Sequence, residues 1–194
     1  MNLPNKITVA RILLIFVFLI LASTGDINDT THETWQYWCH FSAYWIAFFA
    51  ACTDFVDGWL ARRWNMVTNF GALMDPLADK IYVSTTYVMM VYAGVVPAYV
   101  AIVIICREFM VTGLRQLAAK KGTVIAADNL GKIKTTLQMV IIGVSGACWI
   151  NLGGLTREIV GMPYEIMLVA VTIVTVWSGV SYFIRYRELY LEDA

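Results

Sequence analysis

The stretch from Asp54 to Asp79 reads DFVDGWLARRWNMVTNFGALMDPLAD, and the interpretation of the whole chain starts from it. Its four aspartates, Asp54, Asp57, Asp75 and Asp79, lie in or at the ends of segments hydrophobic enough to span a membrane. Ionised carboxylates are costly in that setting, so such a cluster indicates a functional site. Hard divalent cations prefer oxygen ligands of this kind. The stretch therefore predicts a divalent-cation site near a bilayer surface, and with it a phosphate-bearing substrate.

The composition is that of a membrane protein. Of 194 residues, 59% are hydrophobic and 14% are charged, whereas soluble domains carry about 25% charged residues. The length predicts one membrane domain, residues 1–194, with no second soluble domain. The 14 basic and 14 acidic residues cancel, so total charge indicates no nucleic-acid partner.

Six hydrophobic runs separated by polar stretches predict an all-α bundle of six transmembrane helices. Each run is close to the roughly 20 residues that a bilayer core requires. The predicted helices are Ile7–Ser23, Trp38–Leu60, Ala72–Ala93, Pro97–Leu117, Ile133–Leu152 and Tyr164–Ile184. A short interfacial helix is expected over Pro4–Arg11, leading into the first span. Residues 1–25 also resemble a secretory signal, but five further spans follow, and a retained first helix is simpler.

Basic residues predict the orientation of the bundle. With the N terminus in the cytoplasm and six spans, 13 of the 14 Lys and Arg residues fall on the cytoplasmic side. Arg157 is the exception. This distribution follows the positive-inside rule, so both termini and the four aspartates are expected to face the cytoplasm.

Helical spacing brings the acidic positions onto two faces. At about 100° per residue, the acidic and small positions between Asp54 and Ala61 cover an arc of roughly 100°. Those between Gly71 and Asp79 cover roughly 80° of the next helix. A short loop joins the two helices, so their acidic faces can meet. Two divalent cations would relieve the repulsion among the carboxylates and bridge the oxygens of a diphosphate.

This spacing resembles the signature of the CDP-alcohol phosphotransferase family, D-x2-D-G-x2-A-R-x8-G-x3-D-x3-D. All eight fixed positions match: Asp54, Asp57, Gly58, Ala61, Arg62, Gly71, Asp75 and Asp79. The family transfers the phosphoryl-linked part of a CDP-alcohol onto a second alcohol and releases CMP.

The resemblance implies a role for each signature residue. Asp54, Asp57 and Asp75 would hold one divalent cation, Mg²⁺ or Mn²⁺. Asp54, Asp75 and Asp79 would hold the second, and Asp79 would also be the general base. The residues expected to border the CDP moiety are Asp54, Asp57, Gly58, Ala61, Arg62 and Gly71.

Further stretches resemble bacterial family members that join CDP-diacylglycerol to glycerol 3-phosphate, giving phosphatidylglycerophosphate and CMP. These stretches are residues 2–11, 75–80, 107–109, 113–115 and 131–138. The resemblance implies an enzyme of phospholipid biosynthesis in the bacterial cytoplasmic membrane, and it implies a homodimer.

An anionic acceptor needs fixed cations, and Arg107, Arg115 and Lys134 are the candidates to bind its phosphate. Arg107 and Arg115 lie roughly 80° apart on the fourth predicted helix. Lys132 and Lys134 point about 160° apart, so at most one faces the site, and we expect Lys134. The alternative is that all of these are ordinary positive-inside residues whose side chains extend to the membrane surface.

Other functions compete with this interpretation. Within the family, inositol phosphate or serine could be the acceptor. An intramembrane prenyltransferase would need an acid at position 61, where Ala61 stands. A divalent-cation transporter would place acids near the middle of the membrane and in both leaflets, whereas the four aspartates lie at one end. Glu108 is the only acid deep within another predicted span, and the neighbouring Arg107 can offset its charge.

Overall fold

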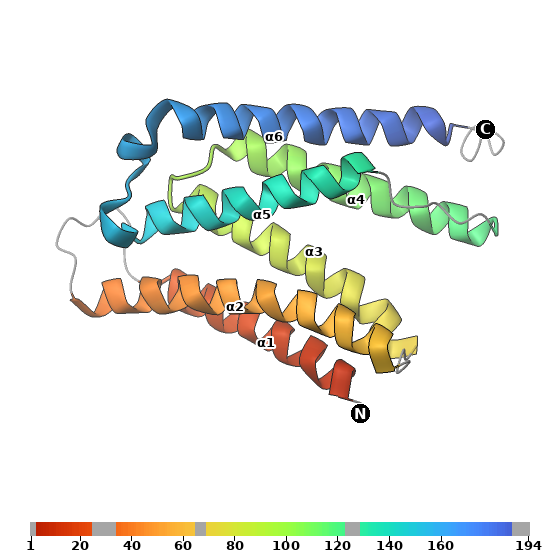
Figure 1. Ribbon diagram of the computed structural model, residues 1–194, viewed down its shortest axis with the longest axis horizontal. Helices are drawn as coiled ribbons and strands as arrows, with labels where there is room; N and C mark the ends of the chain where they lie inside the picture. The colour runs from red at the N-terminus through yellow and green to blue at the C-terminus, as the bar shows by residue number, and fades with distance from the viewer. Residues whose placement is uncertain (1–2, 25–33, 65–68, 123–128, 188–194) are drawn as a thin grey trace.

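The computed structural model describes residues 3–24, 34–64, 69–122 and 129–187, and within these ranges it contains helices and no strand. The helices are α1 (Leu3–Ala22), α2 (Thr34–Trp64), α3 (Asn69–Tyr92), α4 (Ala98–Lys120), α5 (Asn129–Trp149) and α6 (Arg157–Arg185), with a short 3₁₀ helix η1 (Leu152–Gly154) before α6 (Figure 1). The all-α class and the six predicted helices are confirmed.

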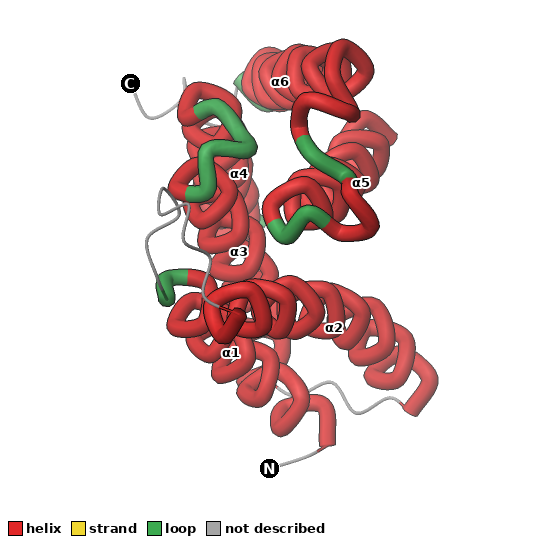
Figure 2. Tube along the Cα trace, turned by 90° about the vertical axis from the view of Figure 1, so that its left-hand side faces the viewer, coloured by secondary structure: helices red, strands yellow, loops and turns green. Residues whose placement is uncertain are grey.

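The helices form two groups joined by α3. On one side α1 packs along α2 and against α3, and on the other side α6 packs against α4 and α5. Helix α3 lies between the groups and also contacts α4 and α5 (Figure 2). The two termini lie at the same end of the bundle (Figure 1), as an even number of antiparallel helices requires.

The N-terminal segment does not form a separate helix. Helix α1 is continuous from Leu3 to Ala22, so the prediction of a distinct interfacial helix over Pro4–Arg11 was wrong. Pro4 lies in the first turn of α1, where its missing N–H breaks no helical hydrogen bond. No further Pro or Gly occurs before Ala22, so nothing interrupts the helix.

The turn between α3 and α4 is a Schellman turn closed by Gly94, whose φ of +69° favours glycine. Its N–H donates to the carbonyl of Val91 at 3.0 Å, and the N–H of Val95 donates to the carbonyl of Met90 at 3.1 Å. Arg157, at the start of α6, donates to the Gly94 carbonyl at 3.0 Å. This turn is therefore tied to the last helix.

Helix α6 consists of two helical segments that meet at a kink. The first begins at Arg157, after the N-cap residue Thr156, whose hydroxyl accepts a hydrogen bond from the N–H of Ile159. Gly161, with a φ of +48°, has a non-helical backbone and separates the two segments. The longer segment follows Gly161, close to the predicted start at Tyr164, and Pro163 lies in its first turn, where a missing N–H breaks no helical hydrogen bond.

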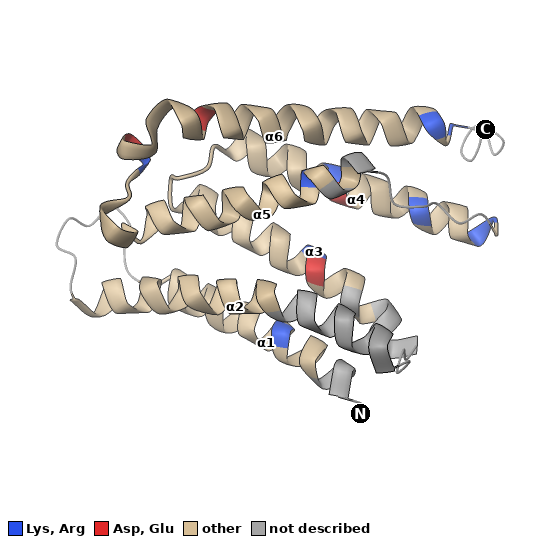
Figure 3. Cartoon of the chain, viewed as in Figure 1, with Lys and Arg blue, Asp and Glu red and all other residues tan. Residues whose placement is uncertain are grey.

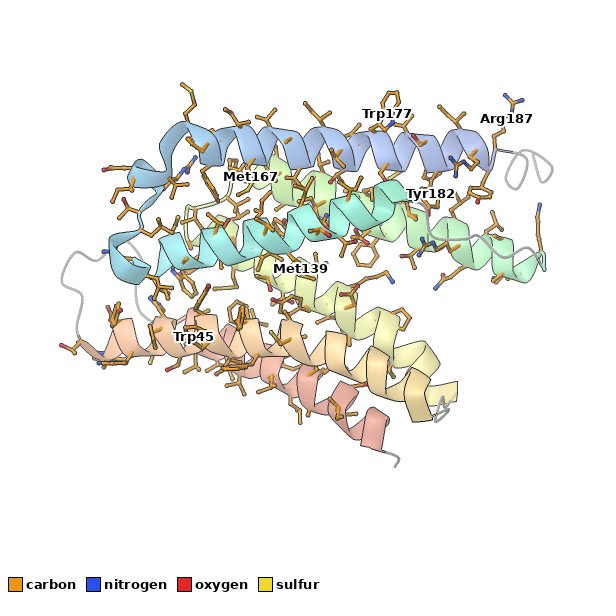
Figure 4. All side chains as sticks on the ribbon, viewed as in Figure 1. Trp45, Met139, Met167, Trp177, Tyr182 and Arg187 are labelled. Atoms are coloured by element: carbon orange, nitrogen blue, oxygen red, sulfur yellow. The ribbon has the colours of Figure 1, made fainter. Side chains whose placement is uncertain are left out.

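The interior of the bundle contains polar side chains, and its outer surface carries large apolar ones. The buried polar and charged residues are Thr8, Arg11, Thr86, Lys134, Gln138, Ser145, Thr175 and Ser178. On the outer side of α6, Ile166, Ile173 and Trp177 are each more than 60% exposed, and Trp177 points away from the other helices (Figure 4). A large exposed apolar surface is typical of contact with a membrane or a partner.

Hydropathy identifies one membrane span in the described ranges. Among the described helices, only α6 is both long enough and apolar enough to cross a membrane. The segments Ile7–Ala22 and Ile133–Trp149 are apolar but shorter. The six-span arrangement therefore stays a prediction.

A cavity of about 570 Å³ lies between α1, α2, α3 and α5. Mainly apolar side chains line it, including Phe18, Phe48 and Met139, which Figure 4 labels on α5. Gly143 and Gly146 form part of its α5 wall. A Cβ atom at Gly146 would lie 2.7 Å from the ring of Tyr44, whereas one at Gly143 would meet no described atom within 4 Å.

Replacing Gly146 by Ala is expected to lower the unfolding temperature, because the added methyl group overlaps the Tyr44 ring and overpacking costs about 1–3 kcal/mol. Gly143→Ala is the matched control. Its methyl group enters open space and should raise stability by about 0.5–1 kcal/mol, since Ala favours a helix more than Gly does. Thermal unfolding in one detergent measures both variants, and equal unfolding temperatures would contradict the close Gly146–Tyr44 contact.

Candidate functional site

The eight signature positions lie on two consecutive helices. Residues 54–62 belong to α2 and residues 71–79 belong to α3. The structure describes the side chain of Asp79 but not those of the other seven positions, which are Asp54, Asp57, Gly58, Ala61, Arg62, Gly71 and Asp75. Their predicted roles lie outside the described residues and stay predictions.

Asp79 is half-buried at a point where four helices meet. It lines a small cavity together with Arg11 of α1, Ala50 and Ala51 of α2, and residues of α3 and α5. Asp79 therefore lies on the side of α3 that faces α2. The residues of α2 in this cavity, Ala50 and Ala51, come about one helical turn before Asp54. This placement agrees with the expected approach of the two acidic faces.

The donor set of the predicted metal site is chemically suited to hard divalent cations, because it consists of carboxylate oxygens. Within the described part of the chain, no three His, Cys, Asp or Glu side chains form a cluster that could hold a metal ion. Three of the four predicted ligands lie outside that part. Asp79 is the described member of the set, and its position facing α2 is compatible with ligands contributed by both helices.

Most of the charged residues that Figure 3 colours lie in the half of the bundle where α1 begins and α6 ends, and a smaller group lies at the opposite end, at the start of α6. Lys134 of α5 is 3% exposed and forms an ion pair with Glu108 of α4. The Nη1 atom of Arg107 lies 3.6 Å from the same carboxylate oxygen of Glu108. Asp79 lies within electrostatic range of Lys134. Lys134 thus faces the interior as expected, while the side chain of Lys132 lies outside the described residues.

The two arginines of α4 are held by α6. Arg107 donates from Nη2 to the hydroxyl oxygen of Ser178 at 2.7 Å. Arg115 donates from Nη2 to the hydroxyl oxygen of Tyr182 at 3.2 Å. The ring of Tyr182, which Figure 4 labels, has its centroid 5.7 Å from the guanidinium carbon of Arg107 and 5.6 Å from that of Arg115. We call Arg107, Arg115 and Lys134 the basic cluster.

Sequence reasoning missed the two α6 residues and the link between Glu108 and Lys134. A signal for the α6 residues was present. Thr175, Ser178 and Tyr182 are polar, they lie three and four residues apart in a helix that is otherwise mostly apolar, and all three are buried. That spacing places them on one helix face. No comparable local pattern relates Glu108 to Lys134, which lie on different helices.

Two buried nitrogen donors of α4 and α5 have no acceptor among the described residues. They are the Nε atom of Arg107 and the Nε2 atom of Gln138, one turn after Lys134 on α5. The hydroxyl group of Thr175 on α6 is also buried without a partner among the described residues. A buried donor without a partner costs about 1–3 kcal/mol. Phosphate oxygens accept hydrogen bonds from donors of these kinds.

The chain is similar to known proteins over most of its length. Residues 1–181 match the family model of the CDP-alcohol phosphatidyltransferases. A protein of Bacillus subtilis (strain 168) is 41% identical over 96% of this chain and 96% of its own length. A protein of Rickettsia typhi is 35% identical over 94% and 95%, and one of Escherichia coli (strain K12) is 33% identical over 99% and 98%. Each is named CDP-diacylglycerol–glycerol-3-phosphate 3-phosphatidyltransferase.

Replacing Glu108 by Gln is expected to destabilise the protein by about 3–5 kcal/mol, because it leaves Lys134 as a buried charge without its counter-ion. Lys134→Met should cost less, since Arg107 stays beside the carboxylate. The matched control is Glu165→Gln, which breaks the exposed ion pair with Arg157 and should cost at most about 1 kcal/mol. Thermal unfolding compares the three variants. An effect of Glu108→Gln no larger than that of Glu165→Gln would contradict a stabilising buried pair.

Proposed function

Since this chain belongs to the CDP-alcohol phosphatidyltransferase family, we propose that it transfers the phosphatidyl group of CDP-diacylglycerol to glycerol 3-phosphate. The products are phosphatidylglycerophosphate and CMP. The observation that carries the proposal is the similarity, over nearly the whole chain, to relatives named for this reaction. The basic cluster of Arg107, Arg115 and Lys134 supports it, because it suits an acceptor that carries a phosphate group.

The donor half of the site is assigned to the signature on α2 and α3. The family generally uses divalent cations, and we assign one to Asp54, Asp57 and Asp75. The second is assigned to Asp54, Asp75 and Asp79, with Mg²⁺ or Mn²⁺ as the ion. Bound there, the cations would offset the negative charge of the diphosphate as the phosphoryl group is transferred. The residues that border the CDP moiety in this proposal are Gly58, Ala61, Arg62 and Gly71.

Asp79 acts as the general base. It accepts the proton of the primary hydroxyl of glycerol 3-phosphate, and the freed oxygen attacks the phosphorus that carries the diacylglycerol. The bond between that phosphorus and the oxygen of CMP breaks, and CMP leaves with the electron pair. Lys134 lies within electrostatic range of Asp79, so the base adjoins the cluster that holds the acceptor phosphate.

Arg107, Arg115 and Lys134 bind the acceptor phosphate in this proposal. Guanidinium groups form paired, charge-assisted hydrogen bonds with phosphate oxygens. The buried Nε–H of Arg107 supports the assignment, because it has no acceptor among the described residues. The pairing of Glu108 with Lys134 lowers the net charge of the cluster and would have to adjust when phosphate binds.

The helices are proposed to cross the bacterial cytoplasmic membrane six times, with both termini and the site on the cytoplasmic side. The shortest, α1, has 20 residues, and at about 1.5 Å per residue this length reaches the roughly 30 Å of a bilayer core. The exposed apolar side chains support the proposal, as does the concentration of charge in the half of the bundle where α1 begins and α6 ends (Figure 3). The apolar cavity between α2 and α5 is compatible with the lipid part of the donor.

Other acceptors, inositol phosphate and serine, remain the alternatives within the family, and the homodimer stays a prediction. A divalent-cation transporter is the alternative outside the family's chemistry. Among the described residues, the deep carboxylate of Glu108 pairs with Lys134 and lies beside Arg107. That pairing favours a structural ion pair over a transit site for cations.

The purified protein is expected to form phosphatidylglycerophosphate when it receives CDP-diacylglycerol, Mg²⁺ and glycerol 3-phosphate. Parallel reactions contain inositol phosphate or serine in place of glycerol 3-phosphate, and mass spectrometry identifies each lipid product. Release of CMP should depend on both the acceptor and the metal, and a chelator should abolish it. A lipid product formed only with inositol phosphate or serine would overturn glycerol 3-phosphate as the acceptor. Uptake of divalent cations by vesicles that contain the protein, without release of CMP, would favour the transporter.

Replacing Asp79 by Asn is expected to reduce turnover by at least about 10²-fold, since general-base catalysis typically contributes a factor of this size. The variant should bind the CDP-lipid better than Asp54→Asn does, because Asp54 is assigned to both cations. Turnover is measured by CMP release and binding by titration with a CDP-lipid in detergent. Equal loss of binding in the two variants would argue against a general-base role for Asp79.

A further inference from the structure

Helix α6 presents a neutral surface to the two arginines of the basic cluster. Ser178 accepts a hydrogen bond from Arg107 at 2.7 Å, and Tyr182 accepts one from Arg115 at 3.2 Å. The ring of Tyr182 lies within 6 Å of both guanidinium carbons, which is the range of cation–π attraction. One aromatic side chain thus contacts two cations that would otherwise repel each other.

The backbone of α6 also lets the side chain of Arg107 come close to this helix. A Cβ atom at Gly179 would lie 3.2 Å from the Cγ atom of Arg107, which is tighter than ordinary contact. The absence of a side chain at this position lets the stem of Arg107 pass along α6 toward Ser178. The sequence from 178 to 182, Ser-Gly-Val-Ser-Tyr, therefore combines a close approach with two hydroxyl acceptors.

Packing fixes the position of these acceptors. Ser178 is 1% exposed and Tyr182 is 3% exposed. Tyr182 packs with Val111 and Leu114 of α4 in a small core of its own. A buried side chain held in this way keeps one orientation, so the hydroxyl and the ring face of Tyr182 are already in place before a ligand binds.

A neutral partner has a different effect from an acidic one. A carboxylate in place of Tyr182 would also hold the arginines, but it would cancel their charge and compete with a phosphate. The hydroxyl groups and the aromatic face of α6 orient the guanidinium groups and add no negative charge to that of Glu108, which lies beside Arg107. Arg107 also keeps a buried Nε–H without an acceptor among the described residues.

We infer that Ser178 and Tyr182 of α6 are positioning residues that hold Arg107 and Arg115 for the phosphate of the acceptor, so that α6 contributes to acceptor specificity. This inference rests on the proposed function, because it takes these arginines as the acceptor site. It adds to that function two residues on a helix that carries none of the family signature.

Tyr182→Leu is expected to raise the KM for glycerol 3-phosphate about tenfold, since it removes both the ring and the hydroxyl. Tyr182→Phe keeps the ring and should raise this KM only about two- to threefold, and Ser178→Ala should act similarly through Arg107. The KM for CDP-diacylglycerol and the kcat should stay near those of the parent. Steady-state assays of CMP release with each substrate varied in turn measure these constants.

The matched control is Trp177→Leu, which removes an aromatic ring from the outer side of the same helix, 66% exposed and away from the cluster. It should leave the KM for glycerol 3-phosphate unchanged. A purely structural role for Tyr182 would lower kcat and unfolding temperature and change both KM values together. If Tyr182→Leu folds poorly, Tyr182→Phe and Ser178→Ala carry the test, and an unchanged acceptor KM in both overturns the inference.

Arg107→Gln and Arg115→Gln separate this inference from the proposed function. If they raise the KM for glycerol 3-phosphate while the Ser178 and Tyr182 variants do not, the acceptor site stands and the positioning role fails. If the arginine variants themselves leave that KM unchanged, the proposed acceptor site fails. A selective rise in the acceptor KM for all of these variants supports both.

Discussion

An ion buried in an apolar helix bundle needs a counter-charge or a hydrogen-bond partner, because an isolated charge there costs several kcal/mol. This protein meets the requirement with contacts across three helices. Glu108 of α4 pairs with Lys134 of α5 and lies beside Arg107. Helix α6 receives the arginines of α4 on Ser178 and Tyr182. Helices α4, α5 and α6 thus bring Arg107, Arg115 and Lys134 into one region, and each of the three has a partner there.

The two groups of helices correspond to two parts of the proposed reaction. Helices α2 and α3 carry the signature that would hold the metal ions and CDP, while α4 and α5 carry the basic cluster and α6 contacts its arginines. Asp79 lies between them. It lines a cavity with residues of α1, α2 and α5, and it lies within electrostatic range of Lys134. In the proposed reaction, a base at this position can accept the proton of the glycerol 3-phosphate hydroxyl group while the basic cluster binds the phosphate group of the same molecule.

Hydrophobic runs predicted the six helices because each run is long and uninterrupted, and the eight-position signature located the acidic site. Prolines were uneven guides to the boundaries. Pro4 falls in a first turn where it is harmless, whereas Pro163 follows Gly161, where the long segment of α6 begins close to the predicted Tyr164. The 100° spacing indicated that at most one of Lys132 and Lys134 faces the site, and the expected one, Lys134, is buried in the bundle. Ser178 and Tyr182 contact residues about 70 positions away along the chain, and no local pattern predicts which distant helix packs there.

The late position of α6 in the chain has a consequence for biosynthesis. The ribosome makes α4 before α6, so in the proposed six-span arrangement Arg107 and Arg115 would enter the membrane before Ser178 and Tyr182 exist. During that interval two guanidinium groups must rely on water, on lipid phosphates or on transient partners. Docking of α6 then supplies the partners of both arginines. A nascent polypeptide would therefore complete the proposed acceptor site only after α6 has been made.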